Sequence, residues 1–154
     1  MTTGNEATGL TPERIQFTAE PLQWTEAIAR VAAPLIADGS VESGYVDAVV
    51  ETARKMGPYF DFGKGIAVPH ARPEAGVNRI ALSFLRTRTP VLLLDDEEHP
   101  IDLFIMLAAT DSSSHLQVLQ GLATVLTDNA AVEALKAAQH PEEVLAIFGE
   151  TNKS

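Results

Sequence analysis

The stretch Ile101-Asp-Leu-Phe-Ile-Met-Leu-Ala108 decides the fold of this chain. A run as apolar as its last six residues is typical of a central strand that is covered on both faces of a sheet. Further short apolar or alternating segments predict other strands at residues 15–19, 65–68, 79–85 and 90–94. The sequence therefore predicts a sheet that lies buried between two other layers.

Two helices are predicted between the first strand and the rest of the sheet. Apolar residues recur close to the helical period over residues 24–37, and Gly39 ends that helix. The same period recurs over residues 44–56, and Gly57-Pro58 ends the second helix. Both helices have one apolar side, so both are expected to pack on the sheet.

Three more helices are predicted after the central strand. Asp111 begins a group of N-cap candidates, and Asp128-Asn129 and Pro141 mark two later helix starts. The first of these helices is expected to turn five apolar residues inward, namely Leu116, Leu119, Leu122, Ala123 and Leu126. The order of elements predicts an α/β fold, a three-layer sandwich with a mixed central sheet flanked by helices.

The composition is that of one acidic globular domain. The 154 residues fit a single domain over residues 11–150, after a flexible tail of residues 1–10. A net charge of −10 disfavours nucleic acid as a partner. No apolar run reaches the roughly 20 residues of a membrane helix, and the tail lacks the basic and apolar regions of a signal peptide. We therefore expect a cytoplasmic protein that is not inserted in the membrane.

The segment Gly65-Ile-Ala-Val-Pro-His-Ala-Arg-Pro73 contains the first candidate for chemistry. His70 follows a predicted strand and Pro69, so the chain should leave the sheet there. Sites in open α/β sheets lie at such strand ends. An imidazole in that place can be a nucleophile, a base or a metal ligand. The alternative is a surface or packed histidine without a catalytic role.

His115 and Arg54 are candidates to assist His70. His115 lies at a predicted helix start, where free backbone N–H groups favour an anion. If the central strand runs beside the strand before His70, both histidines lie at one rim. Arg54, late in the second predicted helix, could give a forked contact to phosphate. Without such roles, His115 is an ordinary helix-start residue and Arg54 a solvated helix-end cation.

These residues together resemble the mannitol/fructose-type IIA domain (EIIA type 2) of the bacterial sugar phosphotransferase system. The segment from Gly65 to Pro73 is similar to the active-site segment of that family. Arg54 stands where the family has an arginine, and His115 where it has a second histidine. The resemblance implies the mannitol-type IIA fold, with His70 as the phosphohistidine and the other two side chains as donors to the phosphoryl oxygens.

The resemblance also implies an activity and its partners. The small carrier HPr would donate the phosphoryl group to His70, and a cysteine of a IIB component would accept it. The membrane component IIC would be served indirectly, and no cofactor or metal would be needed. The segments Gly57-Pro-Tyr-Phe60 and Pro69-His-Ala-Arg-Pro-Glu-Ala-Gly-Val77 resemble the ascorbate-specific branch more narrowly, so ascorbate is the expected sugar.

Three other functions remain open at this point. A regulatory IIA-like domain would carry the same motif and control a transporter or regulator through its phosphorylation state. A metal-dependent hydrolase could use His70, His115 and Asp111, although the sequence contains no recognised metal motif. A small-anion sensor would bind without reacting. The acidic run Asp95-Asp-Glu-Glu98 beside His99 is interpreted as a solvated loop rather than a metal site.

Overall fold

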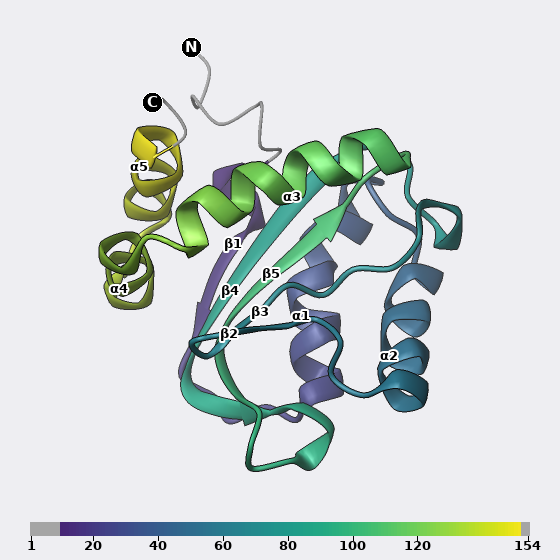
Figure 1. The fold of residues 1–154 in the computed structure, drawn as a ribbon, viewed down its shortest axis with the longest axis horizontal. Coiled ribbons are helices and arrows are strands. Elements are labelled where there is room, and N and C mark those ends of the chain that lie inside the picture. The colour runs from purple at the N-terminus through teal and green to yellow at the C-terminus, as the bar shows by residue number, and fades with distance from the viewer. Residues whose placement is uncertain (1–9, 152–154) are drawn as a thin grey trace.

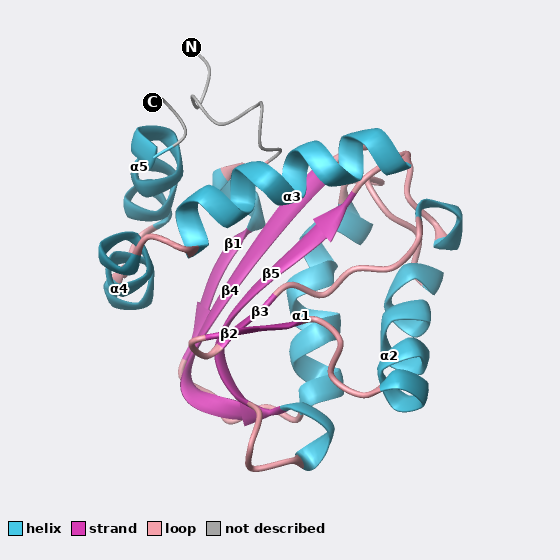
Figure 2. Ribbon diagram, viewed as in Figure 1, coloured by secondary structure: helices cyan, strands magenta, loops and turns pink. Residues whose placement is uncertain are grey.

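The computed structural model, which describes residues 10–151, contains the five predicted helices and a five-stranded sheet (Figures 1 and 2). The strands are β1 (Ile15–Thr18), β2 (Asp61–Gly63), β3 (Ile66–Ala67), β4 (Ala81–Leu92) and β5 (Pro100–Ala108). The helices are α1 (Trp24–Ala37), α2 (Gly44–Met56), α3 (Ser112–Leu126), α4 (Asn129–Ala137) and α5 (Pro141–Thr151). Short 3-10 turns are η1 (Pro12–Arg14), η2 (Pro73–Ala75) and η3 (Leu93–Asp95).

The helices begin and end within a residue or so of their predicted bounds because their end signals are local. The Asp111 carboxylate accepts the Ser114 backbone N–H at 2.8 Å and caps α3. Asp128 caps α4 by accepting backbone N–H groups of the first turn. Each such cap contributes about 1 kcal/mol to helix stability. Gly57, with a φ of 88°, ends α2 in a conformation that favours glycine.

The sheet is mixed, as predicted, with the strand order β1-β4-β5-β3-β2. β1 pairs parallel with β4, and β3 pairs parallel with β5, whereas β4 and β5 are antiparallel. The register between β3 and β5 sets Ile66 opposite Leu103 and Ala67 opposite Phe104. Because these two strands are parallel, their carboxyl ends meet at the same edge of the sheet.

Successive residues of the central strand β5 belong to two different cores. Phe104 and Met106 pack in the cluster formed with α1 and α2. Leu103, Ile105 and Leu107 pack in the cluster formed with α3, α4 and α5. All five side chains are fully buried, and burying each contributes about 1.5–3 kcal/mol. The three-layer sandwich is therefore confirmed, with two helices on one face of the sheet and three on the other (Figure 1).

The two strands predicted at residues 79–85 and 90–94 are wrong as separate elements. They form the single strand β4, and η3 follows at once. The pairing of β4 with β5 shifts register between Arg86 and Val91, so the chain bends there without leaving the sheet. Pro90, which has no N–H to donate, lies within the shifted part and is exposed. Pro90 therefore marks a β-bulge within one strand rather than the start of a new strand.

The strand predicted at residues 65–68 is shorter than expected, and a neighbouring strand was not predicted. β3 has only two residues, and the unpredicted strand β2 pairs antiparallel with it. The β2 sequence Asp-Phe-Gly has little apolar signal and is half-exposed, so only its pairing defines it. Gly63, the last residue of β2, and Lys64 and Gly65 after it all have positive φ angles, which make the tight turn to β3.

Three apolar residues differ from their predicted environments. Met56, expected on the inner side of the helix predicted over residues 44–56, is 73% exposed. Leu116, expected to point inward from α3, is 55% exposed. Leu10, the last residue of the predicted tail, is fully buried in the core beneath α3, α4 and α5. The other residues of that tail, 1–9, lie outside the described part of the chain. Within residues 10–151, the helices are all too short or too polar to cross a membrane.

Candidate active site

His70 lies where the chain leaves the sheet after β3. The Val68 N–H donates to Phe60 O at 2.8 Å, and the Leu107 N–H donates to Pro69 O at 3.0 Å. The chain is therefore hydrogen-bonded on both sides up to the residue before His70. Beyond it the backbone turns away from the sheet toward η2. This is the strand-end position that the sequence predicts for His70.

The His70 ring is oriented by its own segment of backbone. Its Nδ1 atom lies 2.8 Å from Val68 O. A carbonyl oxygen can only accept, so this contact requires a proton on Nδ1. In the neutral ring the lone pair then belongs to Nε2, which makes Nε2 the nitrogen that can attack an electrophile.

Two tyrosines hold the backbone around His70. The Tyr45 hydroxyl donates to Leu107 O at 2.7 Å and accepts from the Ala71 N–H at 2.9 Å. The Tyr59 hydroxyl donates to His70 O, and its ring meets the imidazole edge-on with centroids 5.4 Å apart. Burial raises the pKa of each tyrosine to about 12, so both hydroxyls stay protonated near neutral pH.

The sequence pattern by itself assigns no role to either tyrosine. Tyr45 lies within the second predicted helix, and Tyr59 lies in the segment that resembles the ascorbate-specific branch. A signal was available, since a tyrosine on the buried side of a helix needs a partner for its hydroxyl. Which partner it finds depends on the fold, because Leu107 and Ala71 belong to distant segments.

α3 brings His115 beside His70. The backbone N–H of His115 donates to the backbone carbonyl of Asp111 at 2.9 Å, so His115 lies in the first turn of the helix. The two imidazole rings have centroids 5.2 Å apart and are tilted by 56°. Burial, followed by the proximity of His70, lowers the pKa of His115 below its usual value of 6.5. At neutral pH this ring is therefore uncharged and presents one N–H donor.

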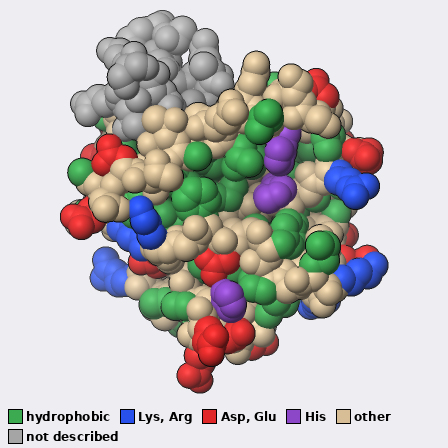
Figure 3. Space-filling model, in the orientation of Figure 1, with side chains coloured by type: hydrophobic (Ala, Val, Ile, Leu, Met, Phe, Trp, Pro, Cys, Tyr) green, Lys and Arg blue, Asp and Glu red, His purple; other side chains and the backbone are tan. Residues whose placement is uncertain are grey.

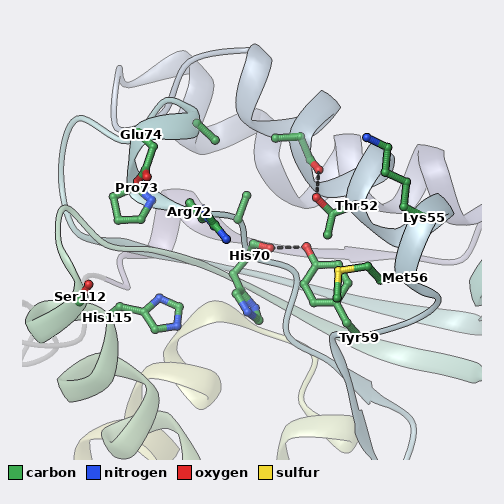
Figure 4. A pocket seen from close by; sticks show the side chains of 13 residues that line it. Thr52, Lys55, Met56, Tyr59, His70, Arg72, Pro73, Glu74, Ser112 and His115 are labelled. Carbon is green, nitrogen blue, oxygen red and sulfur yellow. Dashed lines mark hydrogen bonds between the residues drawn. The ribbon is translucent and has the colours of Figure 1, made fainter.

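Both histidines line a surface cavity of about 730 Å³. The other walls come from α2, from the segment after His70 and from the start of α3 (Figure 4). The space-filling view shows histidine side chains side by side, next to hydrophobic side chains (Figure 3). The polar side chains that line the cavity, besides the histidines, are Thr52, Lys55, Tyr59, Arg72, Glu74 and Ser112.

Arg54 does not line this cavity. Its side chain is exposed on α2, and its guanidinium lies over the Trp24 ring, 5.6 Å from the ring centroid. Its neighbours Lys55 and Met56 do line the cavity. Of the three predicted site residues, the structure thus brings His70 and His115 together. Arg54, the third, packs on Trp24 instead.

Another group of titratable side chains lies away from the cavity. His99 Nδ1 is 2.7 Å from Asp61 Oδ2, so this histidine ties the start of β5 to β2. The acidic residues from Asp95 to Glu98 are exposed. Within residues 10–151, no group of three or more His, Cys, Asp or Glu side chains is placed to hold a metal ion, either there or around His70, His115 and Asp111.

Known proteins have the same fold and a similar sequence. Residues 9–151 match the family described as "Phosphoenolpyruvate-dependent sugar phosphotransferase system, EIIA 2". The chain belongs to this family. EIIA components of the system carry a phosphoryl group on a histidine, so the protein is a phosphotransferase of the sugar phosphotransferase system. The family and the mannitol-type IIA fold implied by the sequence resemblance are both confirmed.

Three known proteins are similar to this chain in sequence or in structure. The ascorbate-specific EIIA component of Escherichia coli (strain K12) is 32% identical over 139 residues, 90% of each chain. The mannitol-specific cryptic phosphotransferase enzyme IIA of E. coli is 26% identical with a TM-score of 0.86, covering 97% of this chain and 99% of that one. Enzyme IIA of the mannitol system, solved with phosphorylated enzyme IIB, is 28% identical with a TM-score of 0.79, covering 92% and 97%.

Proposed function

We propose that this EIIA protein accepts a phosphoryl group on Nε2 of His70 from phosphorylated HPr and passes it to a cysteine of a cognate IIB component. One observation supports this most strongly. The Val68 carbonyl keeps the proton on Nδ1, so the neutral ring has its lone pair on Nε2. A nucleophile needs that lone pair.

The transfer needs no proton to enter or leave the His70 ring. The Nε2 lone pair attacks phosphorus while the nitrogen–phosphorus bond of the donor breaks and the donor ring recovers its electron pair. His70 keeps its Nδ1–H on Val68 O throughout. In the second step the IIB thiolate attacks phosphorus, and Nε2 recovers its electron pair. Such phosphoryl transfers depend mainly on positioning and charge stabilisation.

His115 supplies one part of that stabilisation in this proposal. Its ring lies 5.2 Å from that of His70, measured between centroids, and is neutral at pH 7. A neutral imidazole can donate one N–H to a phosphoryl oxygen without competing for the phosphorus. Arg54, the other donor predicted from the sequence, would need to leave the Trp24 ring to reach the cavity.

The partners follow from the family and its relatives. The mannitol enzyme IIA forms a complex with phosphorylated enzyme IIB, which supports a IIB partner for this chain. The 32% identity to the ascorbate-specific component supports ascorbate as the sugar. The sugar itself meets IIC rather than His70 in this scheme. The net charge of −10 suits a phosphocarrier with a basic docking rim.

The proposal is tested by labelling the protein with radioactive phosphoenolpyruvate in the presence of the general PTS enzyme and HPr. We expect acid-labile label on the wild-type protein and none on His70→Ala. His99→Ala serves as the matched histidine control and should be labelled like wild type. Equal labelling of His70→Ala would remove His70 as the carrier.

A second assay separates transport from the regulatory alternative. Labelled EIIA is mixed with an ascorbate-type IIB or with a mannitol-type IIB, and the loss of label from EIIA is followed. We expect fast transfer to the ascorbate-type IIB and slow transfer to the other. Label that stays on EIIA with both acceptors would favour a regulatory protein, and a faster mannitol-type reaction would contradict the choice of sugar.

A further inference from the structure

A phosphoryl group on Nε2 of His70 brings two negative charges into a cavity of an already acidic protein, and the ring, which keeps its Nδ1–H, offsets one of them. In the unphosphorylated protein His115 is uncharged at pH 7, and Ser112, on the same side of the cavity, has only a hydroxyl to offer. A cation beside the phosphoryl group would add a charge-assisted contact, which is roughly twice as strong as a hydrogen bond between neutral groups. Within the described part of the chain, the cations that line the cavity are Lys55 and Arg72.

Lys55 already has a partner and lies far out on the helix. Its ammonium is 3.9 Å from the Glu51 carboxylate, one helical turn away, and its side chain is 76% exposed. An ammonium is also a strongly hydrated point charge, with no geometric match to a phosphoryl group. Lys55 can contribute to the local potential, but it is a poor choice for a fixed contact.

Arg72 differs from Lys55 in its partners and in the geometry of its charged group. Within residues 10–151 its guanidinium makes no hydrogen bond or ion pair with another side chain, and it lines the same cavity as His70 and His115 (Figure 4). The planar guanidinium presents paired N–H groups that match two phosphoryl oxygens. Only two positions separate it from the proposed carrier along the chain.

The backbone between His70 and Arg72 is held in place. Tyr59 donates to His70 O, and the Ala71 N–H donates to the Tyr45 hydroxyl. The Arg72 carbonyl accepts from the Ala75 N–H at 2.9 Å, which closes η2. Arg72 itself has φ −67° and ψ 151°, the extended conformation favoured before a proline. The guanidinium is thus the mobile part of a residue whose backbone is fixed relative to His70.

We propose that Arg72 is the guanidinium that contacts the phosphoryl oxygens on His70, in the role that the family resemblance assigned to Arg54. The inference rests on the proposed function. Arg54 lies over Trp24 and outside the cavity, whereas Arg72 faces it. Arg72 is then a catalytic residue of the transfer, with His115 as a neutral donor.

The experiment compares two arginines under one assay. Arg72→Gln, Arg72→Lys, Arg54→Gln and the distant control Arg88→Gln are phosphorylated by phosphorylated HPr. Losing one donor to the transition-state charge typically costs about 10²-fold in rate, which is the loss expected for Arg72→Gln. Arg72→Lys should lose about tenfold because it keeps the charge without the fork. Arg54→Gln should lose less than Arg72→Lys, and Arg88→Gln should match wild type.

A small donor distinguishes contact with the phosphoryl group from contact with the carrier protein. Phosphoramidate transfers its phosphoryl group to histidine without any docking surface. If Arg72 contacts the phosphoryl group, Arg72→Gln is slowed with this donor as well, and the ³¹P resonance of its phosphohistidine moves from the wild-type position. A loss seen with HPr alone would make Arg72 a docking residue and overturn the inference.

The outcomes separate the two proposals. If the wild-type protein is not labelled, both the proposed function and the inference are wrong. If wild type is labelled on His70 but Arg72→Gln reacts at the wild-type rate, or Arg54→Gln loses more than Arg72→Gln, the inference alone is wrong. Arg72 is exposed, so its substitutions should fold, and circular dichroism with a thermal melt checks this.

Discussion

His70 and His99 lie beside opposite ends of β5, and in each the Nδ1 atom has an oxygen partner. His70 Nδ1 is 2.8 Å from the Val68 carbonyl, and His99 Nδ1 is 2.7 Å from the Asp61 carboxylate. The distances are nearly equal, so the geometry of the contact does not separate the two residues. The acceptors differ in charge, because a carbonyl is neutral and a carboxylate is an anion.

That difference decides which chemistry each ring can do. The hydrogen bond that His99 donates to the Asp61 carboxylate is the largest cause that raises the pKa of His99 above 6.5, which favours a ring with both nitrogens protonated. Such a ring is a cation that ties β2 to the start of β5, and it has no lone pair. A carbonyl orients the His70 ring without adding a negative charge and leaves the Nε2 lone pair exposed to the cavity.

The largest effect we expect in this comparison comes from the second histidine at the His70 end. His115→Ala removes a neutral donor next to His70 and should slow phosphorylation by about 10²-fold. His115 is a partly exposed helix-start residue, so its loss should leave the thermal melt nearly unchanged. Initial rates with phosphorylated HPr measure the effect, with His99→Ala as the control. A His115→Ala rate equal to wild type would remove His115 from the site.

A smaller effect is expected from the support of the His70 segment. Tyr45→Phe leaves the buried Leu107 carbonyl and the Ala71 N–H without their shared partner, which should lower the free energy of unfolding by about 1–3 kcal/mol. The transfer rate should fall as well, because the backbone after His70 loses its anchor to β5. Urea unfolding curves and the HPr assay on the same preparation measure the two quantities.

Tyr59→Phe is the matched variant for Tyr45→Phe. Tyr59 is less buried and makes a single hydrogen bond, to His70 O, so we expect a loss of about 1 kcal/mol. If Tyr59→Phe destabilises the protein more than Tyr45→Phe, the Tyr45 hydroxyl is not the main support of this segment.

The smallest effect is expected at the other end of β5. Because the folded pKa of His99 is raised, its stabilising contribution is fully present below pH 6.5 and is lost as the pH rises through the folded pKa. Asp61→Asn keeps a side-chain oxygen as acceptor but removes the charge, so this part of the pH dependence should disappear. Urea midpoints of wild type and variant between pH 5 and pH 9 test this. Parallel pH profiles for the two proteins would contradict the prediction.

The prediction from sequence succeeded where the signals are short-range. The bounds of α1 and the start of α3 follow from the spacing of apolar residues and from Asp111, a cap that bonds its own first turn. The strand character of β5 follows from its uninterrupted apolar run. The segment around His70 identified the family, and His70 and His115 do lie together.

It failed where pairing with a distant segment decides the outcome. β4 continues past Pro90 because it pairs with β5 again in a shifted register. β2 is a strand only because it pairs with β3. Leu116 fits the apolar period of α3, yet it is 55% exposed and belongs to neither core cluster. The helical period states which side of a helix is apolar, but not how far the neighbouring layer extends.

By itself the sequence determined the helix ends, the central strand, the three-layer class and the histidine at the end of a strand, because each depends on residues within a turn or two of one another. The tertiary structure decided which side chains line the cavity and which nitrogen of the His70 ring is free. The sequence resemblance favours Arg54 over Arg72, yet Arg72 lines the cavity and the Arg54 guanidinium lies over the Trp24 ring. Long-range packing fixes side-chain directions, and reactivity depends on those directions.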